Sequence, residues 1–240
     1  MTTVLVTQPC WWAPTWWHAR ALAADVVVLL DTAQFARKHR TPSGTTPSWQ
    51  NCCEVKTANG VARLTVPVRA GRRPIACTPV ADPDVLARHL RTLDAAYRRA
   101  PHWDETRALY IELCDVDDTR RAFGLSLGDL TVPISMRVLQ LLGHRDVRVA
   151  SSIDTGDATG SAWMLALAQA VGATRYLAGQ TALATYLDRG AFDAAGVELV
   201  PHRYVDEPYP QRHGPFIGGL SILDLLGNVG ASEAASRLGR

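Results

Sequence analysis

The sequence has little net charge and no long hydrophobic run, and both absences exclude classes of protein. Its 25 Lys and Arg nearly balance its 23 Asp and Glu, so it lacks the one-sided charge that typically binds nucleic acid or an anionic membrane. No stretch approaches the ~20 apolar residues of a membrane span, and no basic leader precedes the first apolar run. We therefore expect a cytoplasmic protein that acts on a small-molecule substrate.

Cysteine is also scarce, and its number and spacing exclude two kinds of structural site. Five cysteines in 240 residues are an odd number and too few for a disulfide framework. No CxxC or CxxxH spacing is present, so the sequence does not predict a bound metal. We expect all five cysteines to be free thiols.

Lysine is rarer still, because only Lys38 and Lys56 accompany the arginines. Such an excess of arginine is typical of a high-GC coding bias, which replaces dispensable lysines. The two that remain are either functional or chance survivors on the surface, and side-chain chemistry alone does not decide between these interpretations.

Hydrophobic runs of strand and helix length alternate along the chain. Buried parallel strands are expected at TVLVTQP, ADVVVLLD, VRVASS, TRYLAG and VELVPHRY, with helices between most of them. This alternation predicts an α/β fold with a doubly wound, mostly parallel, Rossmann-like sheet. We expect residues 1–240 to form one domain with a helical insertion at about 83–142. The Asn59-Gly60 pair predicts a hairpin that begins with CCEVKT, whereas residues 40–50 are expected to be irregular.

Polar residues follow the predicted strands at the edge where open parallel sheets bind ligands. Each could equally be a turn or cap residue. The candidates at these strand ends are Gln8, Cys10, Asp31, Gln34, Ser151, Ser152, Asp154, Gly179 and Gln180.

Tryptophans crowd the segment after the first strand, where QPCWWAPTWW holds four in seven residues. Some of them are expected to line a pocket and to stack against a planar or sugar ring. Trp11 is the candidate in this segment, and Trp49 is a further candidate later in the chain. Ordinary core packing is the alternative.

A basic segment provides a candidate anion site. Arg37, Lys38 and Arg40 precede SWQNCCEVK, which adds Lys56 and the amides of Gln50 and Asn51. Such a cluster could hold a phosphate or carboxylate through charge-assisted hydrogen bonds. A solvated loop is the alternative.

Two thiols near this basic segment are candidate nucleophiles. A thiolate beside a cation has a lowered pKa and is competent for attack, which favours Cys10 or Cys52. Cys52 and Cys53 are adjacent and must point to opposite faces of a strand. A buried cysteine that acts only as a small hydrophobe is the alternative.

Several motifs together resemble the WbqC-like protein family across almost the whole chain. They are QPCWWAPTWWHARALAADVVVLLD, AQFARK, SWQN, LTVPV, SS followed by YLAG and YLD, EPYPQ and SILDLLGN. The family is associated with O-antigen and other biosynthetic gene clusters, so the resemblance implies a biosynthetic role without naming a reaction. Members usually have Asn where this chain has Cys10, and Arg-Asn where it has Cys52 and Cys53. These departures raise the expectation of a thiol-based variant.

Three functions remain open. The first is transfer of an acyl or aminoacyl group to an amine or sugar through Cys10 or Cys52, from an acyl carrier or aminoacyl donor and without a cofactor. Asp31 or Asp154 would orient the acceptor, and Gln50 and Asn51 would stabilise the oxyanion. The second is an ATP-dependent amide-forming ligase that binds phosphates with the basic segment and the turn at 155–161. The third is a non-catalytic protein that binds a sugar or precursor.

Overall fold

A computed structural model describes residues 1–41, 44–69, 71–114 and 124–239. Its centre is a parallel sheet with the strand order β7-β2-β1-β8-β9. The strands are β1 (Thr3–Thr7), β2 (Val26–Leu29), β7 (Val147–Val149), β8 (Arg175–Ala178) and β9 (Glu198–Pro201). Every residue of β2 and all but the last of β1 are buried, as expected of β-branched strands that helices cover on both faces.

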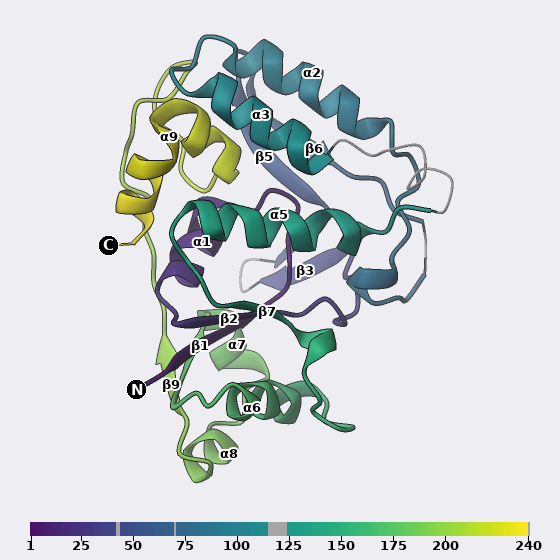
Figure 1. Cartoon of the computed structure of the whole chain (residues 1–240), viewed down its shortest axis with the longest axis vertical. Coiled ribbons are helices and arrows are strands. Elements are labelled where there is room, and N and C mark those ends of the chain that lie inside the picture. The colour runs from purple at the N-terminus through teal and green to yellow at the C-terminus, as the bar shows by residue number, and fades with distance from the viewer. Residues whose placement is uncertain (42–43, 70, 115–123, 240) are drawn as a thin grey trace.

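Helices lie on both sides of the sheet (Figure 1). They are α1 (Thr15–Leu22) and α5 (Leu127–Leu141) on one side, and α6 (Gly160–Ala170), α7 (Gln180–Thr185) and α8 (Arg189–Ala194) on the other. The predicted doubly wound, mostly parallel α/β fold is therefore confirmed. The strand order reverses between β1 and β8, because β2 follows β1 on one side and β9 follows β8 on the other.

The long connection between β2 and β7 holds two hairpins and most of the predicted helical insertion. The elements are β3 (Lys38–Thr41), β4 (Gly44–Pro47), β5 (Cys52–Thr57), β6 (Gly60–Thr65), η1 (Ile75–Cys77), α2 (Val85–Tyr97) and α3 (Trp103–Cys114), followed by α5. The hairpin predicted at Asn59-Gly60 is present as β5–β6, and Gly60 has the positive φ of 97° that such a turn requires.

One local prediction was wrong. Residues 40–50 were expected to be irregular, but β3 and β4 pair there as an antiparallel hairpin. The prediction gave more weight to the Pro and Gly residues of this segment than to the β-branched Thr45 and Thr46, which favour a strand.

The C-terminal helix α9 (Ile222–Leu238) returns to pack against α1 and α3. Its cap, Ser221, accepts a hydrogen bond from the N–H of Leu223 and donates one of 2.8 Å to the carbonyl of Trp12. This contact holds the segment after β1 against the start of α9, beside the β5–β6 hairpin. There the N–H of Ser221 also donates to the carbonyl of Glu54. In the part of the chain that the structure describes, no helix combines the length and apolar character needed to cross a bilayer.

Candidate functional site

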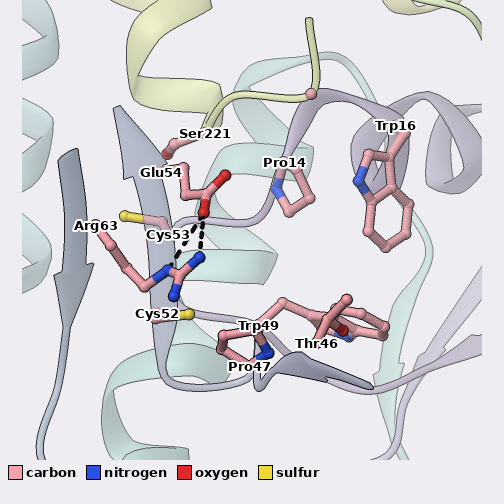
Figure 2. Close-up of a pocket in the computed structure, with 11 residues that line it drawn as sticks. Pro14, Trp16, Thr46, Pro47, Trp49, Cys52, Cys53, Glu54, Arg63 and Ser221 are labelled. Atoms are coloured by element: carbon pink, nitrogen blue, oxygen red, sulfur yellow. Dashed lines mark hydrogen bonds and ion pairs between the residues drawn. The ribbon is translucent and has the colours of Figure 1, made fainter. Parts of the chain in front are cut away.

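A cavity of about 270 Å³ lies between the β5–β6 hairpin, the end of β4 and the start of α1 (Figure 2). We call it the Cys52 cavity. The residues that line it include Pro14, Trp16, Thr46, Trp49, Cys52, Glu54, Arg63 and Ser221.

The β5–β6 hairpin supplies the polar side of this cavity. Cys52 and Glu54 are two residues apart on β5, so their side chains share a face. Arg63 is the cross-strand partner of Glu54, and its Nη2 lies 2.6 Å from Glu54 Oε1. A thiol, a carboxylate and a guanidinium therefore occur together at one wall of the cavity.

The surroundings of Cys52 favour its protonated form. Burial raises the pKa of Cys52, the charge of Arg63 lowers it, and Glu54 raises it again. The Cys52 thiol donates a 2.7 Å hydrogen bond to the carbonyl of Ser48. It becomes a nucleophile only when a substrate or a base removes its proton.

Two tryptophans form the aromatic side of the Cys52 cavity. Trp16 and Trp49 are half-buried, and their rings meet edge-to-face with centroids 5.9 Å apart. The guanidinium of Arg20, one turn after Trp16 on α1, lies 5.4 Å from the centroid of the Trp16 ring. Trp49, which was predicted to line a pocket, therefore lines this cavity together with Trp16.

Trp49 also lines a second cavity, of about 340 Å³, where the strand order reverses. We call it the switch-point cavity. Gln8 from the end of β1 and Gly179 and Gln180 from the end of β8 all line it. The prediction that these three strand-end residues converge is confirmed, and their position matches the general ligand site of open α/β sheets.

Two further predicted residues converge at the neighbouring strand ends. Asp31 after β2 accepts a 3.0 Å hydrogen bond at Oδ1 from the backbone N–H of Ser151 after β7. Ser152 donates to the carbonyl of Val149 and Asp154 accepts from the N–H of Gly156, so both bonds lie within a single turn. Asp31 and these partners line neither of the two cavities.

Two predicted site residues serve the core instead, and a third lies on the surface away from both cavities. Cys10 is 1% exposed, and burial raises its pKa far above the usual range, so it is not a nucleophile open to substrate. Trp11 is fully buried and meets Trp12 and Tyr110 edge-to-face, so it cannot stack against a ligand. Gln34 is exposed at an isolated bridge with Pro74, away from both linings.

The amides expected to stabilise an oxyanion lie in the loop before β5, outside the lining of both cavities. Asn51 Nδ2 donates to the carbonyl of Val66 at 2.8 Å, and Gln50 Oε1 accepts from the N–H of Ala36 at 2.8 Å. Gln50 is fully buried and lines neither cavity. Both residues hold the strand that carries Cys52, and the expected oxyanion role is not supported by their positions.

Lys56 does not join the predicted basic cluster. Lys56 is 1% exposed and its ammonium donates to Gln211, Gly214 and Pro215. The prediction that Lys56 binds an anion was wrong, because its donors are directed at the C-terminal loop.

The other members of that group lie near β3. Arg37 and Lys38 are exposed at its start, and the side chain of Arg40 lies outside the described residues. Arg37 and Lys38 therefore lie on the surface at the start of the β3–β4 hairpin, and the end of β4 borders the Cys52 cavity.

Arg20, Glu54 and Arg63 were missed by the sequence reasoning, and Trp16 was not singled out among the tryptophans of its segment, although spacing could have indicated all four. Trp16 and Arg20 are four apart on a helix, so they share a face. Glu54 and Arg63 are placed opposite each other by counting outward from the Asn59-Gly60 turn. Both inferences require the local structure to be known before the residues stand out.

Comparisons with known proteins give a family and no activity. The model of the WbqC-like protein family matches residues 14–236. The uncharacterized protein Rv1507c of Mycobacterium tuberculosis is 30% identical over 216 residues, which cover 86% of this chain and 85% of that protein. No solved structure matches.

Proposed function

The chain belongs to the WbqC-like protein family, and we propose that it is a biosynthetic group-transfer enzyme that carries an acyl or aminoacyl group on Cys52. The observation that supports this proposal is the position of Cys52, a thiol at a cavity that also holds two tryptophans and an arginine. Cys10, the other candidate, is sealed in the core. The pathway would be that of a specialised metabolite or a polysaccharide.

The proposed reaction has two balanced steps. In the first, Cys52 sulfur attacks the carbonyl carbon of a thioester donor, the bond to the donor sulfur breaks, and the released thiol takes the Cys52 proton. In the second, an amine or hydroxyl of the acceptor attacks the enzyme thioester, and its proton returns to Cys52. No oxidant or cofactor is needed for either step.

The lining residues suit these steps in distinct ways. Trp16 and Trp49 offer apolar surface for the transferred group. The guanidinium of Arg63 lowers the pKa of the Cys52 thiol and offers donors to charge that develops on the carbonyl oxygen. The exposed Arg37 and Lys38, just before the hairpin that ends at this cavity, suit the anionic surface of an acyl carrier.

The ligase hypothesis has less support from the geometry. It relies on residues 155–161 and on a basic cluster with Lys56. Residues 155–161 line neither cavity, and Lys56 is committed to the C-terminal loop.

Intact-protein mass spectrometry tests the thiol proposal. The wild-type chain is incubated with acyl and aminoacyl thioesters of N-acetylcysteamine, beside Cys52→Ala, Cys10→Ala and Cys77→Ser. Cys77 is the matched control, because it is an exposed thiol outside the lining of the cavity. We expect an adduct in the wild type, in C10A and in C77S, and none in C52A.

Two outcomes contradict the proposal. One is an adduct that persists in C52A and disappears in C77S, which would mean non-specific acylation of the surface thiol. The other is the absence of an adduct from every donor with the wild-type chain, which would favour the non-catalytic binding hypothesis.

A further inference from the structure

Arg20 is a cation without an anionic partner. It lies in the last turn of α1, and among the described residues its guanidinium makes no hydrogen bond or ion pair. Its Nε is shielded from solvent and unsatisfied. Burial lowers the pKa of Arg20, and the nearby Tyr186 and Tyr176 oppose this shift. A partly desolvated charge without an anionic partner costs free energy, so its presence calls for a reason.

Two neighbours hold the Arg20 guanidinium in place. On one side it lies over the ring of Trp16, 5.4 Å from the centroid. On the other it lies against the backbone of Gly179, where the Cβ of any larger residue would come within 2.9 Å of Arg20 Nη1 and 3.3 Å of Cζ. Gly179 has φ −74°, which any residue adopts. A larger residue at position 179 would therefore push the end of the Arg20 side chain aside, whereas the backbone conformation accepts any residue.

The guanidinium faces the switch-point cavity, whose lining contains no carboxylate among the described residues. Arg20 is the one Lys or Arg that the described part of the chain contributes to that lining. The polar side chains around it are hydroxyls and amides, including Gln8, Gln180, Thr181 and Tyr186. These groups supply further hydrogen bonds to an anion without neutralising the arginine.

We infer that the switch-point cavity binds the carboxylate or phosphate group of a small molecule, with Arg20 as its counter-ion. The ligand supplies the negative charge that the described lining of the cavity lacks. The guanidinium presents a planar set of donors that matches a carboxylate or a phosphate. The site does not depend on Cys52 chemistry. Because Trp49 lines both cavities, a ligand at Arg20 would lie next to the Cys52 cavity.

Thermal unfolding in the presence of two probe ions tests this inference. Inorganic phosphate and acetate are titrated separately at constant ionic strength with sodium chloride, and Tm is followed, since a ligand of the native state raises it. The variants are Arg20→Gln and Gly179→Ala, which keeps Arg20 but displaces its guanidinium. The matched control is Arg175→Gln on the amino end of β8, which removes one arginine that pairs with Glu198.

We expect a saturable rise in Tm for the wild type and R175Q, and at least a tenfold higher half-saturating concentration for R20Q and G179A. Without added ion, R20Q should have a higher Tm than the wild type, because the uncompensated charge is gone. A stronger response to phosphate or to acetate identifies which group the site prefers. C52A should respond as the wild type does, which separates this inference from the thiol proposal.

Either of two results overturns the inference. In one, R20Q and G179A respond to both ions as the wild type does. In the other, neither ion raises the Tm of the wild type across the millimolar range.

Discussion

Lys56 Nζ donates a 3.1 Å hydrogen bond to Gln211 Oε1, joining positions 155 residues apart in the sequence. The backbone N–H of Lys56 donates to the hydroxyl of Tyr97, and that hydroxyl donates to Asp224 Oδ1 at 2.6 Å. Tyr209 donates to the other oxygen of Asp224 at 2.7 Å. One buried polar network therefore ties β5 to α2, α9 and the loop before α9.

Replacing Lys56 should destabilise the fold strongly. Lys56→Met keeps the length of the side chain but removes three hydrogen bonds of the ammonium, to Gln211 Oε1 and to the carbonyls of Gly214 and Pro215, so we expect a loss of about 2–5 kcal/mol in the free energy of unfolding. Urea denaturation measures it. Lys38→Met is the matched control, because the chain has only these two lysines and Lys38 is exposed. Equal stability of the two variants would contradict a structural role for Lys56.

This network also explains why the role of Lys56 could not be predicted from the sequence. The scarcity of lysine singled out Lys56 and Lys38 alike, but the partners of Lys56 come from a loop far away in the chain. The parallel sheet was predictable, because the apolar and β-branched composition of runs such as VVVL indicates a buried strand. Local pattern predicts an element, whereas the partners of a single polar side chain depend on tertiary contacts.

The reactivity of Cys52 should respond in opposite directions to its two charged neighbours. Arg63 lowers the pKa of Cys52 and Glu54 raises it, so at pH 8 the thiolate fraction should fall in Arg63→Gln and rise in Glu54→Gln. We expect about a two- to fivefold slower and faster alkylation, respectively, since both side chains are partly exposed and screened. The rate of iodoacetamide addition, followed by mass spectrometry in a Cys77→Ser background, measures this.

Arg88→Gln provides the control for this comparison. Arg88 pairs with Asp82 on the surface and lies outside the lining of the Cys52 cavity, so its removal should leave the alkylation rate of Cys52 unchanged. A change of the same sign in R63Q and E54Q, or alkylation of Cys10 ahead of Cys52, would contradict the described electrostatics.

The candidate site was predictable where topology alone places residues together. Gln8, Gly179 and Gln180 converge because the carboxyl ends of parallel strands share one edge of a sheet. The sequence could not distinguish the core residues Trp11 and Cys10 from the cavity residues Trp16 and Cys52. Each pair consists of one tryptophan and one cysteine, and side-chain type alone does not indicate which pair is buried. Burial distinguishes them, and burial depends on how α1 and β5 pack.

Asp31 should act on stability through its hydrogen bond to Ser151 and not on thiol transfer. Asp31→Ala leaves the Ser151 N–H without its acceptor, so we expect a loss of about 1–3 kcal/mol in unfolding free energy. Asp31→Asn retains an Oδ1 acceptor and should lose less than about 1 kcal/mol. Urea denaturation gives both values. If D31N folds normally yet forms no adduct on Cys52, the carboxylate has the catalytic role first predicted for it.

His18 should make the protein sensitive to mild acid. It is 1% exposed, neither ring nitrogen has a hydrogen-bond partner among the residues that the structure describes, and burial lowers the pKa of His18 from 6.5 to about 3. Below pH 6.5 the unfolded chain therefore takes up a proton that the folded chain refuses until about pH 3. Stability is retained above pH 6.5 and falls with decreasing pH, by about 1.4 kcal/mol per unit from this residue.

Urea denaturation at pH 7 and pH 5 isolates that contribution. His18→Leu removes the titrating group, so between these pH values it should lose about 2 kcal/mol less stability than the wild type does. His102→Gln is the control, because its ring is partly exposed and bonded to Glu105, and it should keep the acid sensitivity of the wild type. An equal loss in H18L and the wild type would mean that the folded protein accommodates the His18 imidazolium, and that other groups cause the sensitivity to acid.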